Sequence, residues 1–71
     1  MIVISQDGKL VADYERHIWQ ADGKCIYLIS IDNQYDNYLR FAMFKTEEEA
    51  VKQLRFMVEG ALKGYGTFEF K

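Results

Sequence analysis

The chain has no proline, and it has only one cysteine and one histidine among its 71 residues. A single cysteine forms no internal disulfide, so no covalent cross-link stabilises this short chain. Cys25 and His17 complete a zinc site only by recruiting carboxylates, and we predict no metal and no cofactor. No segment rich in proline or in glycine and serine divides the sequence. Residues 1–71 are therefore expected to form one small domain.

Long apolar runs and an excess of one charge are also missing. No segment approaches the roughly 18 consecutive apolar residues that a membrane-spanning helix needs. The opening MIVISQ lacks the basic and apolar regions of a secretory signal. Nine Lys and Arg against eleven Asp and Glu give a net charge of −2, which favours neither a polyanion nor an acidic membrane as partner. We expect a cytoplasmic protein with no membrane partner.

The residues that catalysis requires do not form a recognisable set. His17 lies on a predicted strand beside Trp19, and no sequence neighbour of Cys25 would lower its thiol pKa. The clustered glycines lie at the end of a helix rather than between a strand and a helix, where a phosphate loop requires them. Eleven carboxylates leave an acid–base pair open, although most have a turn, cap or surface role. We predict no catalytic residues and no enzyme activity.

Two Asp-Gly pairs dominate the first third of the chain. Asp7-Gly8, in the stretch SQDGK, and Asp22-Gly23 each separate two apolar runs. Asp-Gly in this setting predicts a type I′ hairpin turn, in which both central residues have positive φ. We therefore interpret SQDGK as a turn rather than as a ligand-binding loop.

A third hairpin is predicted between residues 24–31 and residues 38–44, which are rich in β-branched and aromatic side chains. The polar loop 32–37 between them contains two Asp and two Asn, but it lacks the ligand spacing of a calcium loop. Together the hairpins predict an antiparallel β-meander of about four strands.

A helix follows the strands. Thr46 and Glu49 have the spacing of a capping box, in which each side chain accepts a hydrogen bond from the other residue's backbone N–H. Helical spacing then predicts a buried apolar stripe, made of Ala50, Leu54, Met57, Val58, Ala61 and Leu62. Gly64 suits the end of the helix, and residues 67–70 alternate as a short strand does. The predicted fold class is α+β, with the helix packed on one face of the meander and a short C-terminal strand.

Two short motifs resemble a known group of proteins. An apolar strand runs into Ser5-Gln6-Asp7, and Phe44 precedes Thr46-Glu47-Glu48-Glu49-Ala50 with Leu54 downstream. This pattern is similar to that of short proteins encoded by prophages and other mobile elements of Gram-positive bacteria. The resemblance covers the two ends of the main domain. It implies an origin in a mobile element, and it implies no function or site.

The two long predicted strands are apolar on both faces. Ile26 and Leu28 lie on one face of the first strand, and we group Tyr38 and Phe44 on one face of the second. Strands of this kind are normally covered on both sides, whereas one helix covers only one. Either sheet curvature and the C-terminal strand cover the remaining face, or another chain does, which we favour. These four residues are candidate interface residues.

A second candidate interface lies on the helix. At about 100° per residue, Phe56 falls almost opposite the apolar stripe, among charged side chains. Gly60 lies one turn further on and would leave room for a side chain of a partner. The alternative is that Phe56 packs under the C-terminal tail against Tyr65 or Phe68.

These observations predict a protein–protein interaction module that forms a homodimer or binds another protein, through the helix face or the second sheet face. The alternative function is single-stranded nucleic-acid binding by sheet aromatics, namely Trp19, Tyr27, Tyr35, Tyr38 and Phe41. Such platforms depend on a positive field. The helix cations alternate with glutamates, and the sequence does not reveal whether the strand cations Arg16, Lys24, Arg40 and Lys45 converge. We expect no nucleic-acid partner.

Overall fold

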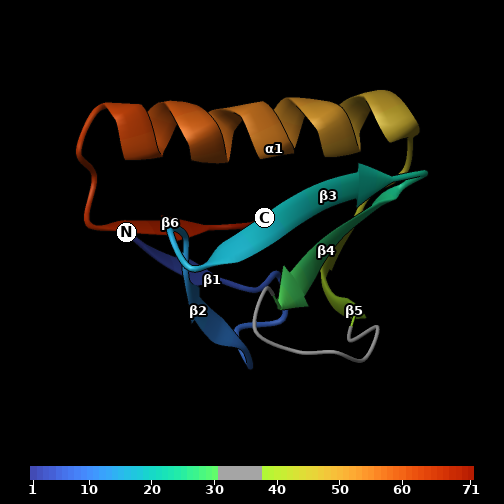
Figure 1. The fold of residues 1–71 in the computed structure, drawn as a ribbon. Helices are drawn as coiled ribbons and strands as arrows, with labels where there is room; N and C mark the ends of the chain where they lie inside the picture. Colours follow the sequence, from blue (N-terminus) through green and yellow to red (C-terminus); the bar gives the residue numbers. More distant parts are fainter. Residues whose placement is uncertain (31–37) are drawn as a thin grey trace.

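The computed structural model describes residues 1–30 and 38–71 as an α+β fold (Figure 1). Its elements are, in chain order, β1 (Ile2–Ile4), β2 (Val11–Asp13), β3 (His17–Asp22), β4 (Cys25–Ser30), β5 (Tyr38–Met43), α1 (Glu47–Leu62) and β6 (Thr67–Glu69). The predicted helix and short C-terminal strand are confirmed. The polar loop predicted at 32–37 lies outside the described residues.

The strands form two three-stranded sheets instead of one meander. In the β1 sheet, ordered β2-β1-β6, Val3 lies opposite Ala12 of the antiparallel β2 and opposite Phe68 of the parallel β6. In the β4 sheet, ordered β3-β4-β5, both pairings are antiparallel. The meander prediction is therefore confirmed for β3, β4 and β5, and the predicted hairpin of β1 with β2 is confirmed as a separate antiparallel pair. The partition into two sheets corrects the predicted continuity between β2 and β3.

The chain passes from the β1 sheet to the β4 sheet between β2 and β3, and these two strands do not pair. The Trp19 indole N–H donates to the carbonyl of Tyr14 (3.1 Å), and Nδ1 of His17 lies 2.9 Å from the carbonyl of Asp13. Two side chains of β3 therefore contact backbone carbonyl groups at the end of β2 and directly after it.

The two Asp-Gly pairs lie in turns, as predicted, but the predicted turn type is wrong. Gly8 and Gly23 have φ of +74° and +58°, whereas no non-glycine residue of the described chain has positive φ. A type I′ turn would require positive φ at two successive residues. In the second hairpin Asp22 pairs with Cys25, so the loop residues are Gly23 and Lys24. These φ signs match a type II′ turn, which has glycine first.

The SQDGK turn is wider and is held by side chains. Ser5 N–H donates to the carbonyl of Leu10 (2.9 Å), and the buried Ser5 hydroxyl donates to Asp7 Oδ1 (2.6 Å) while accepting from Leu10 N–H (2.9 Å). Asp7 Oδ1 also accepts from Lys9 N–H (3.0 Å). The Asp7 carboxylate thus stabilises the turn through these hydrogen bonds, while Asp7 itself has a negative φ.

Gln6, in the same turn, connects the two sheets. Its N–H donates to the carbonyl of Phe41 (2.8 Å), and its Oε1 accepts from Met43 N–H (2.9 Å), so it covers the edge of β5. Its Nε2 donates to the carbonyl of Lys71 (3.1 Å). One residue therefore joins the β1–β2 turn, β5 and the C-terminal segment.

Half of the predicted capping box is present in α1. Thr46 Oγ1 accepts from Glu49 N–H (3.1 Å), but the Glu49 carboxylate accepts from the Gln53 side chain (3.3 Å). The helix ends at Leu62, with Lys63 as C-cap, and Gly64 follows with φ of +78° and donates its N–H to the carbonyl of Ala61. This end agrees with the prediction.

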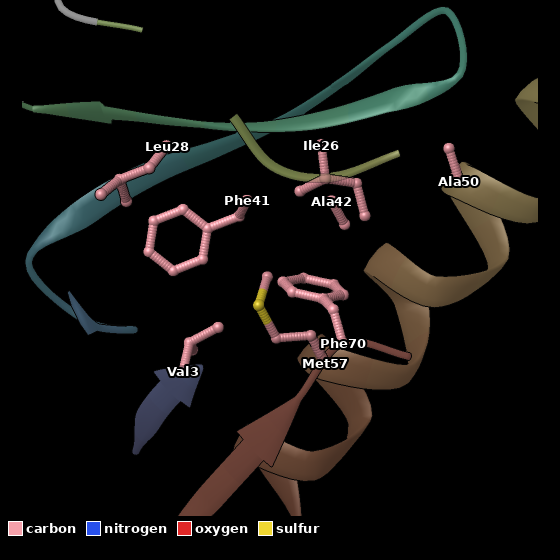
Figure 2. Close-up of a cluster of buried hydrophobic side chains, with 8 residues drawn as sticks. All are labelled: Val3, Ile26, Leu28, Phe41, Ala42, Ala50, Met57 and Phe70. Carbon is pink, nitrogen blue, oxygen red and sulfur yellow. The ribbon is translucent and has the colours of Figure 1, made fainter. Parts of the chain in front are cut away.

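The core lies between α1 and both sheets (Figure 2). It consists of eight buried apolar residues: Val3, Ile26, Leu28, Phe41, Ala42, Ala50, Met57 and Phe70. Figure 1 shows the first half of α1 over β3 and its second half over β6. The buried strip of α1 is Ala50, Met57 and Gly60, so it is rotated from the predicted stripe and leaves Val58 and Leu62 exposed.

Candidate interaction surface

The face of the β4 sheet that points away from the core forms the candidate surface. Opposed residues of antiparallel strands share a face, and successive residues alternate between faces. Because Ile26 and Leu28 point into the core, Ile29 points outward, together with its partners Ile18 on β3 and Tyr38 on β5. An apolar row therefore crosses all three strands.

We define the outer apolar face by six residues of this sheet: Ile18, Cys25, Tyr27, Ile29, Tyr38 and Met43. Ile18, Tyr38 and Met43 are 52%, 53% and 54% exposed, and the other three are half-buried. Single exposed apolar side chains are normal on protein surfaces, but a contiguous group in one face is typical of an interaction site.

The same face of the sheet also carries the polar residues Gln20, Asp22 and Arg40. A hydrogen bond to Cys25, with smaller contributions from the Cys25 and Asp22 charges and from burial, raises the pKa of the Tyr27 hydroxyl. Tyr27 therefore stays neutral at neutral pH, and its ring meets the Tyr38 ring edge to face with centroids 6.1 Å apart. Arg40 and Gln20 lie opposite Tyr27 on β5 and β3, so a polar row separates the apolar row of Ile18, Ile29 and Tyr38 from Cys25 and Met43.

The structure corrects three of the four predicted sheet interface residues. Ile26 is 0% and Leu28 is 5% exposed, so both belong to the core, and Phe44 is half-buried against it. Only Tyr38 lies on the exposed face. Because β4 is apolar on both sides, alternation alone did not reveal which side α1 covers.

A β-bulge causes the remaining error on β5. The register of β4 with β5 shifts between Ile26 and Tyr27, and Phe41 and Ala42 are both buried although they are adjacent. The extra residue reverses the alternation, so Tyr38 and Ala42 point to opposite faces. Met43 and Ile18, which are the most exposed apolar residues of this face together with Tyr38, were not among the predicted interface residues.

The structure also corrects Gly60 as a residue of the predicted helix interface. Gly60 is buried, and a Cβ there would lie 3.2 Å from the Tyr65 ring and 3.7 Å from the Met1 sulfur. Tyr65 thus occupies the space that we assigned to a partner. Phe56 is 43% exposed on the flank of the buried strip, with Lys52 Nζ 5.7 Å from its ring centroid.

The aromatic residues considered for base stacking do not share one face. The rings of Trp19 and Phe41 pack edge to face, 5.1 Å apart, on the inner side of the sheet. Tyr27 and Tyr38 lie on the outer face, and Tyr35 lies outside the described residues.

Within residues 1–30 and 38–71, no cluster of three or more His, Cys, Asp or Glu side chains could hold a metal ion. The described part of the chain also contains no helix with the length and apolar character needed to cross a membrane. No protein-family model, curated protein or solved structure matches the chain.

Proposed function

We propose that the protein is a self-associating protein–protein interaction module and that two copies meet through the β4 sheet. The observation that carries this proposal is the row of Ile18, Ile29 and Tyr38, which places apolar side chains on every strand of that sheet, away from the core. Burial of such side chains against another chain would be favourable by about 25 cal/mol for each Å² removed from water.

The sheet is favoured over the helix because its exposed apolar residues adjoin one another. Phe56 lies among charged residues and carries Lys52 above its ring, and Gly60 offers no opening. The small net charge of −2 also supports self-association, because two copies repel each other only weakly.

Light scattering on two variants tests this proposal. Ile18 lies on the outer apolar face and on an edge strand, so Ile18→Lys introduces a charge into any contact made by the β4 sheet. We expect the unmodified chain to have about twice its 8.4 kDa mass and Ile18→Lys to be a monomer. Phe56→Ser is the control, and it should remain a dimer. A monomeric parent, or a dimer that only Phe56→Ser dissociates, would contradict the proposal.

A further inference from the structure

The two sheets have four edge strands, and three of them are protected from pairing with another chain. β2 and β6 are only three residues long. β5 contains the bulge, and Gln6 bonds the Phe41 carbonyl and the Met43 N–H at its edge. Short length, bulges and covering groups are the usual devices against edge-to-edge association.

The fourth edge strand, β3, has none of these devices. It is six residues long, and all six pair with β4 without a register shift. It contains no lysine and no proline. Within the described residues, β4 is the only strand with which β3 pairs. Its other edge therefore presents a regular row of backbone donors and acceptors.

The hairpin fixes which groups form this row. Asp22 and Cys25 flank a two-residue loop and exchange hydrogen bonds, and bonded pairs then alternate along the strands. Gln20 and Ile18 are bonded to β4 in the same way. The backbone N–H and C=O groups of His17, Trp19 and Ala21 consequently point away from β4.

We infer that β3 of one copy pairs antiparallel with β3 of a second copy. The two-fold axis passes between Trp19 and Trp19 of the partner subunit. This inference rests on the proposed self-association, and it places the contact at the β3 edge rather than on the outer apolar face, which this pairing leaves exposed. The register places Trp19 opposite Trp19 of the partner subunit and His17 opposite Ala21 of the partner subunit. The backbone N–H and C=O groups of His17, Trp19 and Ala21 are then hydrogen-bonded to the partner subunit, and the two β4 sheets join into one.

The charges next to β3 favour a second copy as the occupant and favour this register. Arg16, directly before the strand, is 82% exposed, and its Nε lies 3.8 Å from Asp13 Oδ2. In the proposed register Arg16 lies opposite Asp22 of the partner subunit at both ends of the contact. A shift of the register by two residues in either direction places Arg16 opposite Gln20 or Lys24 of the partner subunit. In both cases the charge pair between Arg16 and Asp22 of the partner subunit is lost.

The helix flank above β3 supports the same arrangement. A hollow of about 320 Å³ separates α1 from β3, and Val58 and Leu54 line its helix side while His17 and Trp19 line its strand side. Val58 and Val51 on this flank are each 37% exposed. A two-fold axis perpendicular to the sheet brings the two helices to the same side, with these flanks toward each other.

A charge swap tests the register. We expect Arg16→Asp and Asp22→Arg each to raise the dimer dissociation constant about tenfold in sedimentation equilibrium, because two symmetry-related pairs change at once. The double variant should return the constant to within about twofold of the parent. Arg55→Asp, on the solvent side of α1, changes the net charge as Arg16→Asp does and should have no such effect. Equal effects of Arg55→Asp and Arg16→Asp, or no rescue in the double variant, would overturn the register.

A backbone variant tests the edge itself. Ala21→Pro removes an N–H that β4 does not use, which an edge strand tolerates. It should dissociate the dimer at concentrations where the parent is dimeric, while circular dichroism shows a folded chain. If Ala21→Pro remains a dimer and Tyr38→Lys dissociates, the copies meet through the outer apolar face, and the edge inference is wrong although the proposed function holds. A parent that is monomeric throughout contradicts both.

Discussion

At the scale of single residues, the stretch Ser5-Gln6-Asp7 does more than reverse the chain. Ser5 and Asp7 hold the turn, and Gln6 extends from it to two distant segments. These bonds give the motif a structural role, so its presence requires no ligand. They also explain why glutamine, with a donor and an acceptor on one side chain, suits this position.

Replacement of Gln6 should therefore lower stability. Gln6→Ala removes the bonds to Met43 N–H and to the Lys71 carbonyl, and we expect a loss of about 1–2 kcal/mol in the free energy of unfolding measured with urea. Gln20→Ala, on the exposed side of β3, is the matched control and should change stability by less than about 0.5 kcal/mol. Equal losses in the two variants would refute the role of Gln6.

Asp7 should make stability depend on pH at the acid end. Its hydrogen bond from the Ser5 hydroxyl, followed by that from Lys9 N–H, lowers its pKa below 3.8. Because the folded-state pKa is the lower one, the carboxylate stabilises the fold above pH 3.8, and this contribution is lost as pH falls through the lowered pKa.

The Asp7→Asn variant isolates this effect, because asparagine keeps an acceptor oxygen but does not titrate. We expect the parent to exceed the variant in unfolding free energy by a constant amount above about pH 5, and this difference to shrink below pH 3.8. Urea unfolding between about pH 2.5 and pH 7 measures it. A difference that stays constant over the whole range would show that the charge is not involved.

At the scale of elements, the sequence predicts what local chemistry determines. The start of α1 follows from Thr46, the end from Gly64, and the turns from Gly8 and Gly23. The partition into two sheets depends instead on the parallel pairing of β1 with β6, at opposite ends of the chain. No local pattern encodes that pairing. The bulge beside Phe41 also has no signal in the sequence. It nevertheless determines that Tyr38 points to the candidate surface.

The turns allow a direct test of the element assignment. Gly8→Val and Gly23→Val should each lower the unfolding free energy by more than about 1 kcal/mol, because a β-branched residue resists positive φ. Gly66→Val is the control, since its φ is not positive and no atom lies within 4 Å of the added Cβ. Melting temperatures equal to that of the parent in both turn variants would show that the turn assignments are wrong.

At the scale of the whole molecule, the positions of the aromatic rings bear on the alternative function. The outer face of the β4 sheet carries Tyr27 and Tyr38, whereas Trp19 packs inward on Phe41. Because the chain has a net charge of −2, it provides little attraction for phosphate groups. We therefore expect no shift of single-stranded DNA or RNA in a gel at low salt. Micromolar retention that weakens steeply with added salt would instead support nucleic-acid binding.

Self-association through the β4 sheet is the proposal that concerns the molecule as a whole. The candidate residues Ile26, Leu28 and Gly60 are buried within one chain, whereas Tyr38 lies on the exposed face of the β4 sheet. The exposed row from Ile18 to Tyr38 and the regular edge of β3 lie on the same sheet. Contact through the outer apolar face and contact through the β3 edge would each give a symmetric pair, and Ala21→Pro and Tyr38→Lys distinguish the two.

The most direct test is the mass of the unmodified chain as a function of concentration, measured by light scattering. We expect about twice the 8.4 kDa chain mass at micromolar concentration, decreasing toward one chain mass on dilution. A mass of one chain at every concentration, up to the highest that the protein tolerates, would contradict it.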